Sequence, residues 1–529
     1  MAKRKRNANG ESSAPAVALP SKKVKATAPE TPQTTTTIQV IAGSYDRVLH
    51  GITATVSPSG ETQFADTFLF DAHQSAIRCL AISQPSAPVP KQTQKVILAS
   101  GSSDERINLY HLSAHAPTKV TVPAIESLNS KAVVESSQNR ELGNLIHHSS
   151  SITALQFPTR GKLLSSADDS TIAVTRTRDW SLLSTIKAPI PKPVGRPSGD
   201  TAPTGGTPSG VNDFAVHPSM KLMISVGKGE KCMRLWNLVT GKKAGVLNFE
   251  RGMLADVGEG RHTSGEGRKV AWGSTDAGEE FCVGFDRGAL VFGMDSKPKC
   301  KIVPEPRSKI HQLCYVEVGD EQDTQVVAVS TDDGRILFYS TRKSDLVLAP
   351  AVESKETPLP AAKLVAQLGG KDAGTESWER SGKPSWRRKV ELRTVDDQKK
   401  KVTPEVKKAN QEKAETQAKF AWTAALATRI KDFTVLSAKN GASKDFFIPA
   451  ASSDGTLRIW KLSADDLVPH NSSKAEQVGT LLGAYETPNR ITCMQAFVML
   501  PSLEGANDDD FEGFDEEDEN PESSSSDSE

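Results

Sequence analysis

Alternation of polar and apolar residues is clearest between Ala450 and Trp460, where the chain reads AASSDGTLRIW. Small residues and two serines end one segment, and Asp454-Gly455 is a dipeptide typical of tight turns. The residues from Thr456 to Trp460 then alternate polar and apolar side chains, with the period expected for a half-buried β-strand. The stretch therefore predicts a β-hairpin.

The same hairpin pattern recurs along the chain. A turn acid is followed six residues later by an aromatic residue in most copies, whereas two copies keep the acid and lose the aromatic. The pairs are Asp46 with Ile52, Asp104 with Tyr110, Asp169 with Thr175, Glu230 with Trp236, Asp286 with Phe292, Asp333 with Tyr339, and Asp454 with Trp460. The closest acids, at 286 and 333, are 47 residues apart. Because a four-stranded propeller blade takes about 40–45 residues, we expect an all-β, seven-bladed β-propeller.

The two ends of the predicted propeller complement each other. Ordered structure should begin near Thr37, but no inner strand precedes the first hairpin. The segment Arg490–Val498 reads as an unassigned strand near the other end of the chain and can supply the missing one. A closing blade built from N- and C-terminal strands would remove the free edges of an open sheet array.

The propeller is expected to span residues 37–500. Residues 1–36 are rich in Ala, Pro, Thr, Ser and Lys, and residues 501–529 are acidic and Ser-rich, so both are expected to be disordered tails. Loop insertions within the propeller are expected at about 113–138, 188–209, 341–361 and 370–425.

Composition narrows the functional classes. The 529 residues are 37% hydrophobic and 5% aromatic, which is low for one compact globule but fits a repeat fold diluted by polar loops and tails. The six cysteines are scattered without a CxxC pair, so we expect a reducing compartment and neither disulfides nor a zinc site. No apolar run approaches the ~18 residues of a membrane span, and no apolar segment follows the basic N-terminus as in a secretory signal.

Charge is segregated along the chain, although Lys+Arg and Asp+Glu are equal at 65 each. Two basic clusters, Lys3-Arg4-Lys5-Arg6 and Lys22-Lys23-Val24-Lys25, resemble a bipartite nuclear-import signal; a solvated tail that touches nucleic acid loosely is the alternative. Between Arg380 and Lys413 twelve Lys/Arg occur, which suits contact with rRNA phosphates. Residues 502–529 hold thirteen Asp/Glu, which suits either a basic client or a purely solubilising role.

The turn-plus-aromatic repeats resemble the WD-repeat family. Segments 43–51, 71–83 and 210–242 are similar to one branch, the nucleolar ribosome-biogenesis proteins of fungi whose animal relatives are the PAK-interacting (p21-activated-kinase-interacting) proteins. The likeness covers most of 38–498, and 210–242 is its most specific part. Glu230 in place of Asp is one departure from the repeat signature, and Ile52 and Thr175 in place of Trp are two more.

Candidate catalytic residues are few. His73, Ser100 and Asp104 could be read as a triad, but the resemblance implies a buried hydrogen-bond chain that locks a WD-repeat blade and ends at its aromatic residue. The other turn acids and aromatics are assigned the same structural role. The GKGEK stretch at 227–231 lacks the spacing of a phosphate-binding loop, and His147-His148 is expected to be a surface pair. No catalytic, cofactor-binding or metal-binding residue is predicted.

The resemblance implies a non-enzymatic scaffold for assembly of the large (60S) ribosomal subunit, located in the nucleus and nucleolus. Such a scaffold would escort or dock a basic ribosomal-protein-like client on pre-60S particles, and we expect a monomer without a membrane contact. An adaptor that binds and restrains a PAK-type kinase is a second class. Another nuclear platform, for chromatin or a ubiquitin ligase, is a third.

Overall fold

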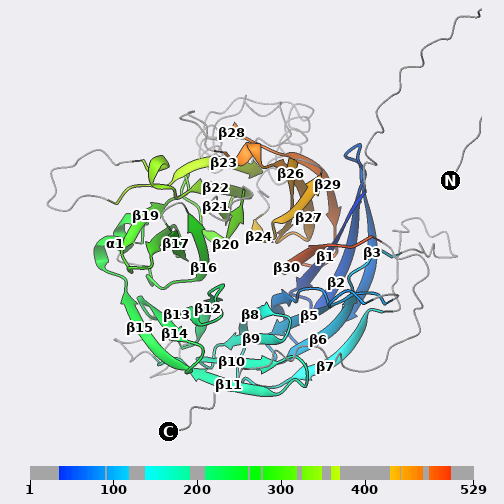
Figure 1. The fold of residues 1–529 in the computed structure, drawn as a ribbon, viewed down its shortest axis with the longest axis horizontal. Helices are drawn as coiled ribbons and strands as arrows, with labels where there is room; N and C mark the ends of the chain where they lie inside the picture. Colours follow the sequence, from blue (N-terminus) through cyan, green and yellow to red (C-terminus); the bar gives the residue numbers. More distant parts are fainter. Residues whose placement is uncertain are drawn as a thin grey trace, which may run out of the picture.

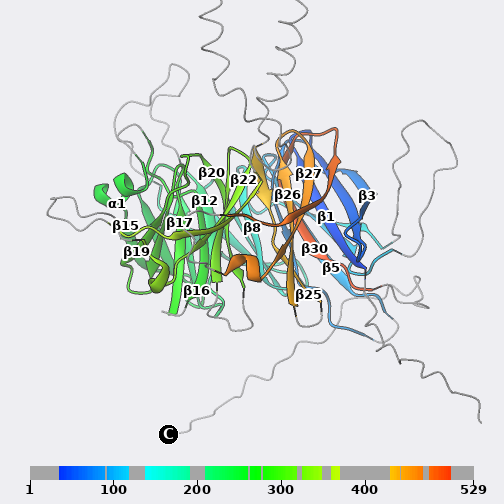
Figure 2. The same cartoon turned by 90° about the horizontal axis from the view of Figure 1, so that it is seen from above.

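The computed structural model describes residues 35–89, 92–117, 138–190, 209–259, 263–275, 278–318, 325–347, 359–369, 429–440, 443–468 and 476–501. Within these ranges seven β-sheets are arranged around a central axis, each running from an inner to an outer strand (Figure 1). A side view shows a flat ring whose strands run between its two faces (Figure 2). The fold is the seven-bladed β-propeller expected from the sequence. Most of the basic N-terminal tail, the basic stretch at 380–413 and the acidic tail at 502–529 lie outside the described residues.

Four blades are each built from four consecutive strands, in chain order from the inner to the outer strand. Their strands are β4 (Ile77–Ile82), β5 (Lys95–Ser102), β6 (Ile107–Ser113) and β7 (Arg140–Leu145); β8 (Ile152–Thr159), β9 (Lys162–Ala167), β10 (Thr171–Arg176) and β11 (Leu182–Lys187); β12 (Val211–Val216), β13 (Leu222–Gly227), β14 (Cys232–Asn237) and β15 (Lys242–Asn248); and β16 (Lys269–Thr275), β17 (Gly278–Gly284), β18 (Ala289–Gly293) and β19 (Pro298–Ile302). A short helix, α1 (Arg251–Asp256), follows β15.

Two further blades carry an additional strand. In one, β20 (Ile310–Glu317), β21 (Gln325–Thr331), β22 (Arg335–Ser340) and β23 (Lys363–Gly369) are extended by β28 (Glu476–Gln477), which pairs in parallel with β23. In the other, β24 (Ile430–Phe433), β26 (Ser443–Ser452), β27 (Thr456–Ser463) and β29 (Thr480–Glu486) are joined by β25 (Leu436–Asn440). Two 3₁₀ turns, η1 (Lys343–Asp345) and η2 (Asp465–Leu467), lie after β22 and β27.

The closing blade combines both ends of the ordered chain. Its strands follow the order β3 (Thr62–Asp71), β2 (Val48–Val56), β1 (Thr36–Ser44) and β30 (Ile491–Val498), with β30 innermost. The strands β1 and β30 are antiparallel and in register from the Ile38–Val498 pair to the Gly43–Cys493 pair. In Figure 1, red β30 lies beside blue β1. The closure predicted from the sequence is confirmed.

The segment 429–440 is divided into two strands, β24 and β25. Both strands pair with β26, and the break between them lies opposite Pro449. Proline has no N–H to donate to a sheet partner, so the ladder is interrupted at this residue and resumes beyond it. The Pro449 carbonyl instead accepts a hydrogen bond from the Thr434 N–H at 3.1 Å.

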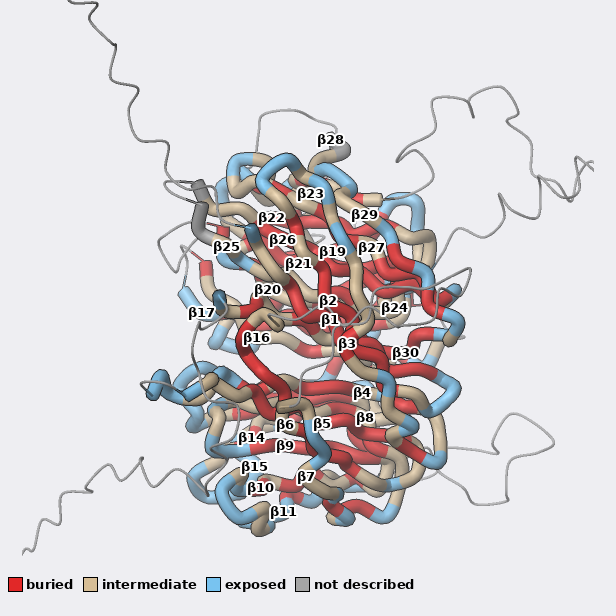
Figure 3. The backbone as a smooth tube through the Cα atoms, turned by 90° about the vertical axis from the view of Figure 1, so that its right-hand side faces the viewer, coloured by how far each residue is buried: buried red, intermediate tan, exposed pale blue. Residues whose placement is uncertain are grey.

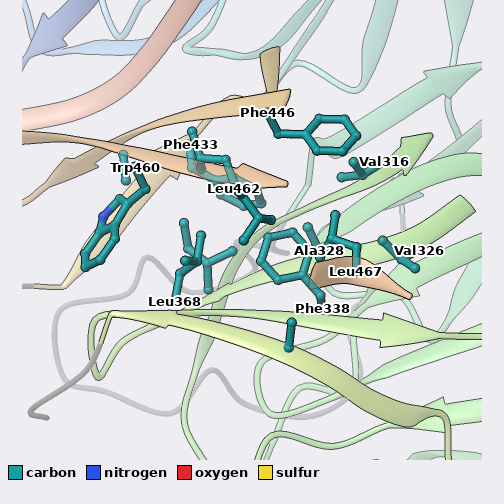
Figure 4. Packing of buried hydrophobic residues seen from close by; sticks show 14 of the residues in the cluster. Val316, Val326, Ala328, Phe338, Leu368, Phe433, Phe446, Trp460, Leu462 and Leu467 are labelled. Carbon is teal, nitrogen blue, oxygen red and sulfur yellow. The ribbon is translucent and has the colours of Figure 1, made fainter. Parts of the chain in front are cut away.

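Apolar side chains fill the space between neighbouring blades. Buried residues follow the strands, whereas exposed ones gather at turns and outer segments (Figure 3). Between the blades that begin at β20 and β24, Phe338, Phe446 and Trp460 pack with Leu368 and Val316 (Figure 4). Complete burial of one such side chain contributes roughly 1.5–3 kcal/mol. Interdigitated packing of this kind makes the ring a rigid support for the loops on its faces.

Candidate functional site

The seven turn acids occupy equivalent places in the fold. Each lies in or beside the turn between the second and third strands of its blade, counted from the axis. The residue six positions later is buried in the third strand in every blade, with an exposed fraction between 0% and 7%: Ile52, Tyr110, Thr175, Trp236, Phe292, Tyr339 and Trp460. The acids are therefore distributed around one face of the ring, one per blade, rather than gathered in a single pocket.

His73, Ser100 and Asp104 do come together within the blade that begins at β4. The Nδ1 atom of His73 lies 3.1 Å from an Asp104 carboxylate oxygen, and its Nε2 atom lies 2.8 Å from the Ser100 hydroxyl. Asp104 also accepts hydrogen bonds from the backbone N–H groups of Gln74 and Arg106 at 3.0 and 3.1 Å. The His73 side chain is fully buried, so the triad offers no open face to a substrate.

Titration behaviour fits this enclosed arrangement. Burial lowers the pKa of His73, although the neighbouring Asp104 carboxylate acts in the opposite direction. Burial alone would raise the pKa of Asp104, but the Gln74 N–H and His73 outweigh it and hold the pKa below its usual value. Burial also raises the pKa of Tyr110 to about 12, against hydrogen bonds with Asn108 and Ser100. The network thus favours a neutral, hydrogen-bonded histidine beside an ionised carboxylate.

His148 repeats the network in the next blade, so the expectation of a surface pair at His147-His148 is wrong for this residue. Its side chain is buried, with Nε2 at 2.8 Å from the Ser165 hydroxyl and Nδ1 at 3.2 Å from Asp169. The sequence carried a usable signal, because a serine stands four residues before the turn acid in both blades. Asp169 also accepts a hydrogen bond from the Thr171 hydroxyl at 2.6 Å.

The other turn acids find different partners. Glu230 forms a two-pronged ion pair with Arg234, and Trp236 in the same blade donates its indole N–H to the Ser225 hydroxyl at 2.8 Å. Asp333 accepts from the Arg335 guanidinium at 2.8 Å. A phosphate-binding role for 227–231 is not supported, because these residues form a turn in which Glu230 is held by its own strand.

The three remaining turn acids form ion pairs or single hydrogen bonds with backbone N–H groups. Asp286 pairs with Arg268 at 2.6 Å and with Lys309 at 3.1 Å. Asp46 accepts from the Arg490 backbone N–H at 3.3 Å, which joins the closing blade to its C-terminal strand. Asp454 is exposed and accepts the Thr456 N–H at 3.0 Å.

A second polar group, on the inner strands, was not predicted. Asp213 on β12 lies 3.8 Å from the Lys269 ammonium group on β16. Asp432 on β24 accepts hydrogen bonds at 3.0 Å from the backbone N–H groups of Phe433 and Met494. Burial raises the pKa of Asp432 to about 6, against the effect of the Met494 N–H and of Lys269. No local pattern of residues predicts this group, because its members come from different blades.

Glu280 is a further buried acid that sequence reasoning missed. It has no exposed surface, and its carboxylate accepts from the Lys299 ammonium at 2.5 Å, the Tyr315 hydroxyl at 3.0 Å and the Thr341 hydroxyl at 2.6 Å. Tyr315 and Thr341 belong to the following blade, so this carboxylate joins two blades. A buried charge is tolerated only with such partners.

The described part of the chain has neither a metal-binding cluster nor a membrane-spanning helix. Across the described ranges no three His, Cys, Asp or Glu side chains gather as a metal site would require. The same ranges hold no helix with the length and apolar character needed to cross a membrane. All six cysteines are free thiols.

The ring and its turn signatures define a seven-bladed WD-repeat β-propeller. The family model described as "WD domain, G-beta repeat" matches residues 139–174, which run from β7 into β10 and include His148 and Asp169. The resemblance to WD-repeat proteins stated from the sequence is thereby confirmed.

Known relatives fall into two named groups. The chain is 27% identical over 324 residues to Protein MAK11 of Saccharomyces cerevisiae, covering 57% of this chain and 62% of that protein. It is 27% identical over 215 residues to the p21-activated protein kinase-interacting protein 1-like of Danio rerio, covering 40% of this chain and 43% of that protein. Shk1 kinase-binding protein 15 of Schizosaccharomyces pombe is 25% identical over 309 residues, or 58% of this chain and 69% of that protein.

The matched regions are partial, since the chain spans 62% and 43% of the first two relatives. The named branch of the resemblance agrees with these relatives. Fold and relatives together identify a WD-repeat β-propeller that is similar to these two groups of proteins.

Proposed function

We propose that this protein is a non-enzymatic scaffold for assembly of the large ribosomal subunit, acting in the nucleus and nucleolus. The observation that carries the proposal is the similarity to MAK11 over 324 residues, together with the resemblance to the ribosome-biogenesis branch. A closed ring with buried polar networks supports this role, because it presents loops at fixed positions without offering an open catalytic triad.

The charged extensions would supply electrostatic contacts around this platform. The acidic residues at 502–529 suit a basic ribosomal-protein-like client, and the basic stretch at 380–413 suits rRNA phosphates. Complementary charge mainly raises association rates and partner selectivity. Such contacts must be direct to matter in the cell, because screening at 0.15 M salt reaches only about 8 Å.

The turn acids and the buried residues that follow them serve, on this proposal, to stabilise the blades. His73, Asp104, Asp169 and Glu230 all bond within their own blades. Substitutions at these positions should therefore act through folding. Partner contacts should lie on the face loops.

Depletion of the protein in a cell that expresses it tests the assembly role. Free large subunits should fall relative to small ones in gradient sedimentation, and the tagged protein should sediment with large-subunit precursors. An unchanged subunit ratio with unchanged rRNA processing would contradict the proposal.

A kinase-regulating adaptor is the second candidate. The names of the Danio rerio and Schizosaccharomyces pombe relatives favour it, since each describes a protein that interacts with a kinase. Purification of the tagged protein from nuclear extract separates the two: pre-60S proteins should dominate on the first proposal, and a PAK-type kinase on the second.

A further inference from the structure

The residue immediately before each inner strand holds an equivalent place in all seven blades. We call these the entrance positions: Ala76, Ser151, Gly210, Arg268, Lys309, Arg429 and Arg490. In all blades but that of Arg268, the entrance carbonyl accepts a hydrogen bond of 2.8–3.1 Å from an N–H in the turn between the second and third strands. In the remaining blade the Arg268 N–H donates instead to the Gly284 carbonyl at 2.7 Å. The entrance positions therefore lie at the same face of the ring, close to its centre.

Charge at the entrance positions is confined to one sector. The blades that begin at β4, β8 and β12 carry alanine, serine and glycine there, whereas the four that begin at β16, β20, β24 and β30 carry a cation. These four inner strands follow one another around the axis (Figure 1). Lys431, the second residue of β24, adds a fifth cation. We call these five residues the cationic arc.

Carboxylates neutralise only part of the arc. Asp286 forms ion pairs with both Arg268 and Lys309, Glu266 forms a further pair with Arg268 at 3.4 Å, and Asp332 lies 3.4 Å from the Arg429 Nε atom. Within the described ranges, Lys431 and Arg490 make no ion pair. Burial lowers the pKa of Lys431; Asp332 acts against this, while Arg429 and Arg490 lower the pKa further. The centre of the arc therefore retains an excess of positive charge that an anion would relieve.

An exposed aromatic ring adjoins the arc. Tyr45 is 60% exposed, and the Arg490 guanidinium carbon lies 5.8 Å from the centroid of its ring. The Tyr45 N–H also donates to the Arg490 carbonyl at 2.8 Å, which fixes the turn beside this entrance position. A solvent-facing aromatic beside guanidinium groups is the combination on which unpaired bases stack while phosphates bind.

We propose that the cationic arc and Tyr45 form a binding surface for single-stranded RNA. The arc would hold consecutive phosphates, and arginines suit this because a guanidinium can donate two parallel hydrogen bonds to one phosphate. Tyr45 would stack on a base. An acidic peptide could use the same cations but has no base for Tyr45, so RNA is favoured. The proposal deepens the assembly role and rests on it, because pre-ribosomal particles would supply the RNA.

The test uses the full-length protein and a fluorescent 12-nucleotide oligouridine, with anisotropy measured at several salt concentrations. The arc variant combines Arg429→Gln, Lys431→Gln and Arg490→Gln. A matched control, Lys187→Gln with Lys242→Gln and Lys243→Gln, removes three exposed cations from the outer strands β11 and β15. The arc variant should bind roughly tenfold more weakly, with a log–log salt slope reduced by about 2, because each lost phosphate contact contributes ~0.7. The control should bind like the wild type.

Tyr45→Ala supplies an independent readout that leaves the charge unchanged. It should weaken RNA binding about fivefold or more through lost stacking, while Tyr45→Phe should retain the affinity. A polyglutamate probe distinguishes an acidic-peptide surface. If the arc variant lost polyglutamate binding while RNA binding was unaffected, or if the control variant lost as much RNA affinity as the arc variant, the proposal would be overturned. Either result leaves the assembly role to be judged separately by depletion.

Discussion

The Tyr485 hydroxyl donates a hydrogen bond of 2.5 Å to the Asp66 carboxylate, although the two residues are 419 positions apart. Tyr485 lies on β29, the outer strand of the last blade, and Asp66 on β3, the outer strand of the closing blade. His50 approaches the same Asp66 oxygen at 2.7 Å, and Phe64 packs against the Tyr485 ring with centroids 5.5 Å apart. The ring is therefore joined at its periphery as well as by β30 at its centre.

Tyr485→Phe should lower the free energy of unfolding by about 1–3 kcal/mol, because the half-buried Asp66 carboxylate loses one of its donors. Burial and the Asp66 carboxylate both raise the pKa of Tyr485, so the phenol stays protonated and able to donate across the neutral range. Urea denaturation at neutral pH measures the change. Tyr45→Phe, at an exposed tyrosine, is the control and should leave stability unchanged.

Deletion of 488–529 should destabilise the whole propeller, whereas deletion of 502–529 should not. The longer deletion removes β30 and leaves β1 with an unpaired inner edge. It also removes Leu500, whose backbone pairs with Ala114 and Ala116 through hydrogen bonds of 2.8 and 2.9 Å. Thermal melting of the two truncated proteins is the measurement. Equal melting temperatures would refute closure by the C-terminal strand.

Asp104→Ala should cost more stability than Asp454→Ala. Asp104 accepts hydrogen bonds from His73, Gln74 and Arg106, so its removal leaves the buried His73 ring and two backbone N–H groups without this acceptor, at a cost of about 2–3 kcal/mol. Asp454 is exposed and accepts a hydrogen bond from the Thr456 N–H. Because water can replace this acceptor, Asp454→Ala should lower the free energy of unfolding by about 1 kcal/mol.

Trp460→Ala should cost roughly 3–5 kcal/mol, because it empties a space between two blades. Denaturant unfolding of this variant gives the cost, and partner capture is measured in parallel. Loss of partner binding with unchanged stability would mean that a binding residue had been mistaken for part of the scaffold.

Local and repeated features of the fold could be predicted from the sequence. The acid-containing turn recurs in every blade, and seven copies with one missing inner strand require closure by the C-terminal segment. Features that depend on contacts between distant segments could not be predicted. In the sequence Glu280 is an ordinary strand residue. Only the folded structure brings the hydroxyl groups of Tyr315 and Thr341, from the next blade, to its carboxylate. The parallel pairing of β28 with β23 likewise follows from the path of the chain and not from a residue pattern.

The candidate site was predictable to a similar extent. His73 and Asp104 were identified because their spacing matches a familiar blade pattern. The cationic arc was not identified, because its members are separated by insertions of unequal length. Only the structure places Arg429 and Arg490 at equivalent positions of adjacent blades.

Nuclear entry should depend on the N-terminal basic clusters. Alanine at Lys3 to Arg6 and at Lys22, Lys23 and Lys25 should leave a fluorescent fusion in the cytoplasm, because an acidic receptor groove would lose the spaced cations that it binds. The fusion must exceed the size that diffuses passively through nuclear pores. Unchanged nuclear accumulation in microscopy would mean that a partner carries the protein into the nucleus.

The inner-strand carboxylate Asp432 should make stability depend on pH. Burial raises its pKa from 3.8 to about 6, so between these values the folded protein retains a proton that the unfolded chain releases. Stability from this group is therefore present below about pH 4 and is lost as pH rises through 6. Lys269, the Gln312 side-chain amide and the Met494 N–H face the same carboxylate and act against this rise in pKa.

Asp432→Asn should remove this dependence, because the amide does not titrate. Urea unfolding of both proteins from pH 4.5 to 7.5 measures it. The wild-type stability minus the variant stability should fall as pH rises to about 6.5 and then level off. The absolute stability of the variant is a poor readout, because its amide group would face the Met494 N–H, which needs an acceptor. A difference that stays constant across the range would show that Asp432 keeps an ordinary pKa in the folded protein.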